Sequence, residues 1–211
     1  MKVSWSRVIP VLAFLILLLA GWTGGPQNSA DFAIVAEAAK LRSHDPLLTA
    51  APALLTHLGD AYVLLPLSAA VAAILFAIGR RRSALLLFLT VAGERMLLDG
   101  VKILVGRPRP ELDEHPVMTH SFSFPSGHAA NTMTVFVAIA LFALPERHRW
   151  WSVPTGIALA AMVAATRPWL GVHWPTDIIG GWMLAALSIW AALWAQERFR
   201  LTDRVPSRTE A

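Results

Sequence analysis

The chain has 211 residues, of which 55% are hydrophobic and only 15% are charged, and its mean hydropathy is +0.53. With this few charged residues, a soluble globular domain would have too little polar surface. The composition therefore excludes a soluble globular protein and predicts an integral membrane protein. Eighteen basic and 14 acidic residues give a formal net charge of +4, but no basic stripe interleaved with aromatic residues indicates a nucleic-acid partner. Cysteine is absent, which excludes disulfides, thiol catalysis and cysteine-ligated metals.

Six apolar segments approach the roughly 20 residues that a helix needs to cross a bilayer. In chain order they cover residues 3–22, 61–78, 83–104, 128–144, 151–165 and 178–195. The first follows basic residues and also resembles a secretory signal, but the five later segments favour a retained anchor. No internal repeat or second domain is visible. We therefore predict an all-α fold, a bundle of six transmembrane helices that forms a single domain over residues 1–211.

The basic residues predict the orientation of this bundle, because Lys and Arg accumulate in short cytoplasmic segments. Most of them lie before the first span, between the second and third, between the fourth and fifth, and after the sixth. These residues are Lys2, Arg7, Arg80, Arg81, Arg82, Arg147, Arg149, Arg198, Arg200, Arg204 and Arg208. We therefore expect both termini in the cytoplasm and the remaining connections on the outer face.

The longest connection covers residues 22–60, on the outer face. Within it, residues 31–41 place Phe32, Val35 and Ala39 on one helical face. We interpret this segment as a short interfacial helix over the mouth of a site at the outer end. A solvated loop with one or two helical turns is the alternative.

The first chemically informative stretch comes at the outer end of the third span. Lys102 is followed after six residues by Arg109-Pro110. A lysine supplies a mobile point charge and an arginine supplies a planar fork of donors, which are two complementary ways to hold phosphate oxygens. Taken alone, the segment also fits a basic cluster that touches lipid headgroups.

The second stretch is Pro125-Ser126-Gly127-His128, directly before the fourth span. Ser126 is placed to cap the helix, and Gly127 allows an anion to approach the exposed amide groups of the helix start. His128 then lies in the first turn, where it is placed to give a proton to a leaving oxygen. An ordinary serine-capped helix with a packed histidine is the alternative.

The third stretch joins the fifth and sixth spans. It contains Thr166-Arg167, then His173, and Asp177 four residues later. This spacing lets the carboxylate bond one imidazole nitrogen and leave the other free to attack phosphorus. A polar contact without catalytic purpose is the alternative for this pair alone.

The three stretches together resemble the signature of the type 2 phosphatidic acid phosphatase superfamily. The ordered set covers Lys102 to Asp177. It begins with a Lys that is separated by six residues from Arg-Pro and continues with Pro-Ser-Gly-His. It ends with an Arg that is separated by five residues from a His, which is in turn separated by three residues from an Asp. The family's third motif begins with Ser where this chain has Thr166. Thr166 keeps the hydroxyl but adds a methyl group, so it is the weaker binding candidate.

The resemblance implies a role for each matching residue. His173 would attack phosphorus to form a phosphohistidine, Asp177 would orient it, and His128 would protonate the leaving group and then activate water. The remaining positions would bind the phosphate oxygens without a metal or cofactor. They are Lys102, Arg109, Ser126, Gly127, Arg167 and Thr166.

The implied protein is a phosphatase of the bacterial cell membrane, with its active site on the extracytoplasmic side. Phosphatidic acid, phosphatidylglycerol phosphate and undecaprenyl diphosphate are the implied substrates, and the sequence does not choose among them. It also leaves the oligomeric state open. A lipid phosphotransferase with the same intermediate and a transporter or binding protein for lipid phosphates are the alternatives. Outside the motifs, Arg95 and Asp99 are expected to pair along the third helix, and Asp60 faces the same end without an assigned role.

Overall fold

The computed structural model describes residues 5–45, 47–112, 116–117, 121–199, 201 and 203. In these ranges the chain is helical and contains no strand, which confirms the all-α prediction. The α-helices are α1 (Trp5–Thr23), α2 (Ser29–Arg42), α3 (Leu47–Thr56), α4 (Ala61–Ala77), α5 (Arg81–Val105), α6 (Gly127–Ala138), α7 (Arg149–Trp169) and α8 (Pro175–Arg198). Three short segments join them: the 3-10 turns η1 (His57–Gly59) and η3 (Glu146–His148), and the π-helical segment η2 (Ile139–Ala143), which continues α6.

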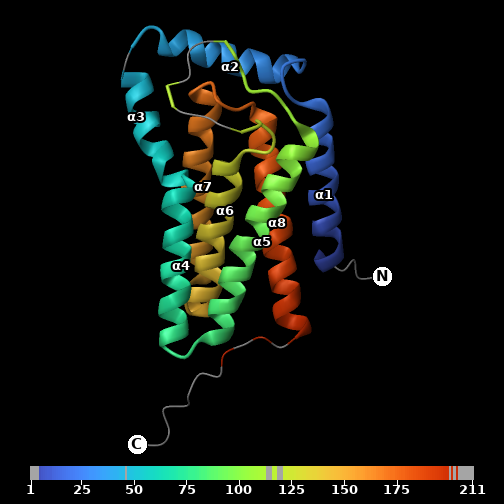
Figure 1. The fold of residues 1–211 in the computed structure, drawn as a ribbon, viewed down its shortest axis with the longest axis vertical. Helices are drawn as coiled ribbons and strands as arrows, with labels where there is room; N and C mark the ends of the chain where they lie inside the picture. Colours follow the sequence, from blue (N-terminus) through green and yellow to red (C-terminus); the bar gives the residue numbers. More distant parts are fainter. Residues whose placement is uncertain are drawn as a thin grey trace, which may run out of the picture.

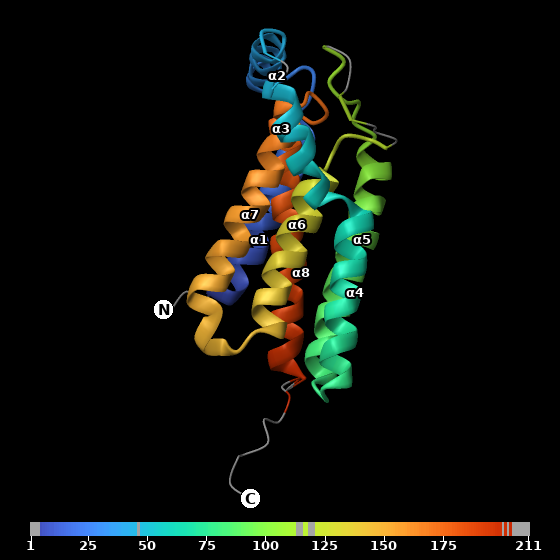
Figure 2. The ribbon, with the colours of Figure 1, turned by 90° about the vertical axis from the view of Figure 1, so that its left-hand side faces the viewer.

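The six helices α1 and α4 to α8 lie side by side, and α2 lies across one end of them (Figures 1 and 2). Among the packed pairs, α1 lies against α8, α4 against α5, and α6 against both α7 and α8. The connections from α4 to α5 and from α6 to α7 lie at the end away from α2, as does the C-terminal end of α8 (Figure 1). The basic residues of these connections are therefore separated from the end where α2 and α3 lie.

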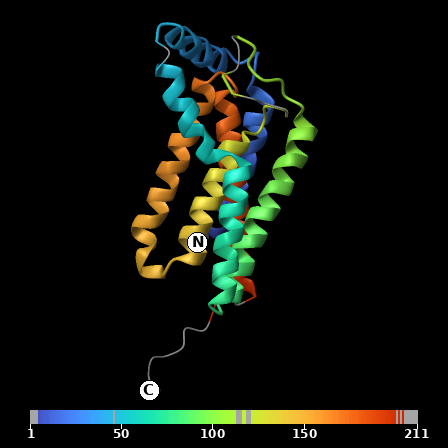
Figure 3. The same ribbon diagram turned by 60° about the vertical axis from the view of Figure 1, so that its left-hand side comes forward.

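The helix bounds match most of the predicted spans, and the structure differs from the prediction in two places. The connection over residues 22–60 holds α2, which confirms the predicted short helix, and also α3, which the sequence analysis missed. Through η1, α3 leads into α4 with a bend (Figure 3). The fifth predicted span corresponds to α7, which continues to Trp169. Thr166 and Arg167 therefore lie in the last turn of α7 instead of the following loop. Lys2, Arg200, Arg204, Arg208 and residues 3–4 of the first predicted span lie outside the described residues.

Apolar surface extends over the outward faces of several helices. On α1, α4 and α5, the side chains of Leu19, Ile74 and Leu104 are 61%, 60% and 85% exposed. Among the described residues, two stretches, Leu47–Ala77 and Pro175–Arg198, are long and apolar enough to cross a bilayer, while Val8–Thr23 and Gly127–Ala143 are apolar but shorter. Length and composition thus support two of the six predicted spans, and the outward apolar side chains are typical of a lipid-facing surface.

Local signals place the ends of the helices near the predicted site. Gly106 ends α5 in a left-handed conformation with φ 60°, which a glycine adopts without steric cost. Ser126 is the N-cap of α6, as predicted, and Pro175 occupies the first turn of α8. All three ends lead into the segments that carry the sequence motifs.

Close packing fixes α8 against the start of α6. A Cβ atom added at Gly181 would lie 2.7 Å from the carbonyl oxygen of Ser126 and 3.0 Å from the amide nitrogen of Ala130. Both neighbours are backbone atoms, so they cannot rotate away as a side chain would. Small residues of this kind let transmembrane helices approach closely.

Replacing Gly181 by alanine is expected to lower the unfolding temperature of the purified protein, because overpacking of this kind costs about 1–3 kcal/mol. The matched control is Gly100→Ala on α5, where an added Cβ meets nothing within 4 Å. The control should leave the unfolding temperature unchanged or raise it. Equal shifts for the two variants, measured by thermal denaturation in detergent, would contradict the close contact.

Candidate active site

The three motif stretches converge on a cavity of about 300 Å³ at the end of the bundle near α2 and α3, here called the central cavity. Six of the nine predicted site residues line it. They are Lys102, Arg109, Gly127, His128, Arg167 and His173. Ser126, Thr166 and Asp177 are buried beside it and do not line it. The roles of all nine remain predictions.

The contacts of His173 define which ring nitrogen carries the proton. Nε2 lies 3.0 Å from Nη1 of Arg109, and Nδ1 lies 3.2 Å from Oδ2 of Asp177. A guanidinium can only donate, so Nε2 must accept, and the proton of the neutral ring is on Nδ1, facing the carboxylate. The spacing predicted this contact between Asp177 and one imidazole nitrogen. The lone pair that remains on Nε2 faces the cationic side of the cavity.

The surroundings of His173 favour the uncharged imidazole. Burial, and then the positive charges of Arg109, Arg167 and Lys102, hold the pKa of His173 well below its ordinary value of 6.5. The side chain is only 2% exposed. At neutral pH the ring is therefore neutral, which is the state that a nitrogen nucleophile requires.

The carboxylate of Asp177 uses both oxygens. Oδ2 accepts hydrogen bonds from the hydroxyl of Ser123 and, at 2.9 Å, from the backbone N–H of Trp174, in addition to His173. Oδ1 lies 2.7 Å from Nη1 of Arg107, and both side chains of this ion pair are almost completely buried. The saturated carboxylate cannot rotate without losing several hydrogen bonds, so it holds the imidazole in one orientation.

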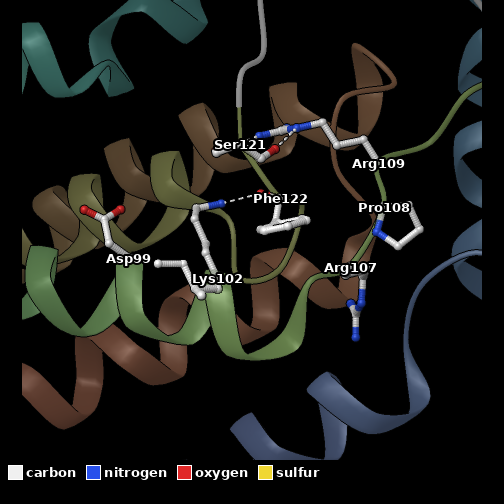
Figure 4. A pocket seen from close by; sticks show the side chains of 8 residues that line it. Asp99, Lys102, Arg107, Pro108, Arg109, Ser121 and Phe122 are labelled. Carbon is white, nitrogen blue, oxygen red and sulfur yellow. Dashed lines mark hydrogen bonds between the residues drawn. The ribbon is translucent and has the colours of Figure 1, made fainter.

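Arg107 was missed by the sequence analysis. Its Nη2 donates to the carbonyl oxygens of Ala20 at 2.6 Å and Gly21 at 2.9 Å, and its guanidinium lies 4.4 Å from the ring centroid of Phe124. Arg107 and Arg109 point in different directions from the same short segment (Figure 4). Arg107 therefore joins α1 to Asp177, while Arg109 enters the central cavity.

Lys102 and Arg167 are each held by a hydrogen bond and keep further N–H donors that bind no other group in the described part of the chain. The Nζ of Lys102 donates to the carbonyl of Phe122 at 2.6 Å (Figure 4). Arg167 donates from Nη1 to the hydroxyl of Thr56 at 2.7 Å, whereas its buried Nε has no hydrogen-bond partner among the described residues. Burial lowers the pKa of Arg109 to about 10, so this guanidinium stays charged at neutral pH. These groups are suited to bind an anion.

The start of α6 adds backbone donors to the cavity wall. The hydroxyl of Ser126 accepts from the amide of Ala129 at 3.5 Å, and Gly127 lines the cavity. The first amide groups of a helix attract anions. Thr166 is placed differently, because its hydroxyl donates to the carbonyl of Val163 at 2.6 Å within α7. Thr166 does not line the central cavity.

Asp60 forms an ion pair with the predicted acid, His128. Its Oδ1 lies 3.1 Å from Nε2 of His128, and its Oδ2 lies 2.8 Å from Nδ1 of His57. Burial alone would raise the pKa of Asp60, but hydrogen bonding with its neighbours outweighs burial and brings it below the ordinary value. An ionised carboxylate therefore adjoins His128. The sequence placed Asp60 at this end but gave it no partner.

Two further observations bear on the predictions. Arg95 and Asp99 form the expected pair along α5, with 2.9 Å between Nη2 and Oδ1. Within the described ranges, no group of three or more His, Asp or Glu side chains is placed to hold a metal ion. Metal-free chemistry nevertheless remains a prediction.

Substitution of Arg107 by alanine should destabilise the protein strongly, since it leaves the buried carboxylate of Asp177 without its partner. Breaking a buried ion pair in this way costs about 3–5 kcal/mol. The control is Arg95→Ala, which breaks an ion pair whose side chains are 36% and 49% exposed and should cost at most about 1 kcal/mol. Thermal denaturation in detergent compares the two, and a similar loss for both would contradict the structural importance of Arg107.

The depressed pKa of His173 predicts a pH-dependent stability. The unfolded chain takes up a proton near pH 6.5 and the folded chain only at lower pH, so stability from this residue is complete above about pH 6.5 and falls as the pH decreases. Between about pH 7.5 and 5.5 the unfolding temperature of the wild type should therefore fall more than that of His173→Gln. Identical falls would show that His173 protonates normally in the folded protein.

Comparison with known proteins assigns the chain to a family. The profile of the PAP2 superfamily matches residues 83–201. Phosphatidylglycerophosphatase B of Bacillus subtilis is 35% identical over 181 residues, which cover 83% of this chain and 87% of the relative. An undecaprenyl-diphosphatase of Sulfolobus acidocaldarius is 40% identical over 65 residues, covering 31% of this chain and 29% of that protein.

A solved structure agrees with these matches over nearly the whole chain. The crystal structure of a transmembrane PAP2-type phosphatidylglycerolphosphate phosphatase from Bacillus subtilis superimposes with a TM-score of 0.81 and 31% identity. The match covers 95% of this chain and 98% of the other. The profile, the relative and the solved structure confirm the family membership that the three motifs predict: the chain belongs to the PAP2 superfamily.

Proposed function

We propose that this protein is a membrane phosphatase that hydrolyses the phosphate monoester or diphosphate of a lipid. The observation that carries the proposal is the neutral His173, whose Nδ1 proton faces Asp177 and whose Nε2 faces a cavity lined by four cationic side chains. Relatives named for phosphatidylglycerophosphate and undecaprenyl diphosphate support a lipid substrate. These two lipid phosphates and phosphatidic acid are the proposed substrates.

In the first proposed step, Nε2 of His173 attacks phosphorus and the bond to the leaving oxygen breaks. His128 gives that oxygen a proton, and the Nδ1 proton of His173 stays with the ring, held by Asp177. Arg109 now donates to Nε2, so an arriving phosphate must draw this guanidinium onto its own oxygens. Arrival of the anion would thereby free the nucleophile.

In the second step, water attacks the phosphohistidine. His128 accepts the proton of that water, the P–N bond breaks, and inorganic phosphate leaves with His173 restored to its neutral form. The leaving group carries away the proton given in the first step, so His128 also returns to its starting state. Both steps therefore balance without an additional reactant.

Charge stabilisation is assigned to the groups that line the central cavity. Lys102, Arg109 and Arg167 would neutralise the equatorial oxygens, together with the amides at the start of α6, which Ser126 caps and Gly127 exposes. This set takes the place of a metal ion, so no metal or cofactor is included. Thr166 would contribute only if its hydroxyl left the carbonyl of Val163.

We also propose that α1 and α4 to α8 form six spans of a single domain over residues 1–211, in the bacterial cell membrane. The central cavity lies at the opposite end of the bundle from the connections that carry Arg80–Arg82 and Arg147–Arg149 (Figure 1). Basic connections favour the cytoplasmic side. Both termini would then be cytoplasmic and the active site extracytoplasmic.

Phosphate release by detergent-purified protein tests the proposal directly. Wild type should release phosphate from at least one of the three lipids, with EDTA present. His173→Ala should reduce turnover at least about 10³-fold because the nucleophile is lost, and His128→Ala should reduce it by about 10²–10⁴-fold. The matched control His148→Ala, in η3 at the far end of the bundle, should retain full activity.

Three outcomes would contradict this account. Transfer of labelled phosphate to a second lipid would favour a phosphotransferase. Full activity of His173→Ala would exclude this residue as the nucleophile. Binding of lipid phosphate without any turnover by folded wild-type protein would favour a transporter or binding protein.

A further inference from the structure

The central cavity lies between two larger ones that share different parts of its wall. A cavity of about 590 Å³, here the α5-side chamber, shares Lys102, Arg109 and Ser121 with it (Figure 4). A cavity of about 660 Å³, here the α3-side chamber, shares Asp60, Tyr62, His128 and Arg167 with it. Of these three cavities, the central one alone has the proposed nucleophile, His173, in its wall. Each chamber thus adjoins the cavity in which the proposed reaction takes place.

The chemistry of displacement at phosphorus distinguishes the two chambers. The attacking and leaving atoms lie on opposite sides of phosphorus, roughly in line. The acid must reach the leaving oxygen within hydrogen-bond distance. His128 lines the α3-side chamber and is absent from the wall of the α5-side chamber. The leaving oxygen, and whatever is attached to it, must therefore lie on the side of the α3-side chamber.

We infer that the α3-side chamber is the binding site for the leaving group. Its ligand is an alcohol or phosphate that carries a hydrocarbon chain, held with its polar end toward His128. This inference rests on the proposed function, because it uses His173 as nucleophile and His128 as acid. It adds the direction in which the substrate extends and the segment that contacts it.

The walls of the α3-side chamber match such a ligand. Tyr62 of the shared wall carries a hydroxyl, and His57 beside it carries a ring nitrogen, and both groups can bond the oxygens of a polar headgroup. Ala53 and Leu54 of α3 supply an apolar wall. The chamber thus combines polar groups with apolar side chains, as a lipid headgroup and its chain require.

Apolar surface continues from this chamber along the bundle. Leu54 and Leu58 are 75% and 50% exposed, and below them Val63 and Leu67 of α4 are also exposed. The stretch Leu47–Ala77 is long and apolar enough to cross a bilayer. A hydrocarbon chain leaving the chamber can therefore remain in contact with apolar side chains as it follows α4.

The α5-side chamber provides a matched comparison. It too has an exposed apolar side chain on its wall, since Ile103 is 75% exposed, the same fraction as Leu54. Exposed hydrophobic surface alone therefore does not choose between the chambers. The position of His128 does, because, of the two chambers, His128 lines only the α3-side chamber.

Two tryptophan substitutions of equally exposed residues test this assignment. Leu54→Trp narrows the α3-side chamber and Ile103→Trp narrows the α5-side chamber. For each full-length variant, kcat/KM is measured with phosphatidylglycerol phosphate and with 4-nitrophenyl phosphate, whose leaving group has no hydrocarbon chain. Leu54→Trp should lower the ratio of the lipid value to the small-substrate value on the order of tenfold or more, and Ile103→Trp should leave the ratio unchanged.

The experiment distinguishes failure of the chamber assignment from failure of the proposed function. A fall in the ratio for Ile103→Trp alone, or equal falls for both variants, would overturn the assignment of the α3-side chamber while wild-type turnover still supports the phosphatase. An unchanged ratio in both variants would overturn it as well. Absence of turnover by folded wild-type protein with every substrate would overturn the proposed function itself.

Discussion

The buried carboxylate of Asp177 is the group on which the arrangement of the site depends. A charge in the interior of a membrane protein is costly unless it is paired and hydrogen-bonded. Arg107 neutralises one oxygen, and donors from Ser123, Trp174 and His173 satisfy the other. Because Arg107 also binds carbonyls at the end of α1, the same pair joins α1, the segment after α5 and the start of α8. The orientation of the imidazole is thus tied to the packing of the bundle.

Around Asp177 and His173 the structure gathers positively charged side chains, and the neighbouring carboxylates neutralise them only in part. The mutual proximity of Lys102, Arg109 and Arg167 disfavours protonation of His173, and it also makes an incoming phosphate the missing counterion. The unpartnered Nε of Arg167 and the donation from Arg109 to Nε2 are two signs of this state. Donors placed before the anion arrives need little reorganisation, which is the physical basis of electrostatic catalysis.

Part of this architecture could be predicted from the sequence and part could not. The run of residues 61–78 and the cap at Ser126 are local signals, and they agree with α4 and α6. Helix α3 was missed because its apolar residues show no polar face and it lies within a long connection with prolines. Arg107 differs from Arg109 only in the direction of its side chain, which depends on distant carbonyls of α1. Asp60 could not be assigned a role because its contact with His128 joins two segments that are far apart in the sequence.

The central claim is a covalent phosphohistidine on His173, and its direct measurement is the phosphorylated residue itself. Wild-type protein turning over a labelled lipid phosphate would be stopped rapidly in alkali, which preserves phosphohistidine, then digested and analysed by mass spectrometry. The account predicts label on the peptide that contains His173, formed and lost at rates compatible with turnover, and none in His173→Ala. Steady turnover with no labelled enzyme, or label on another residue such as His128, would contradict it.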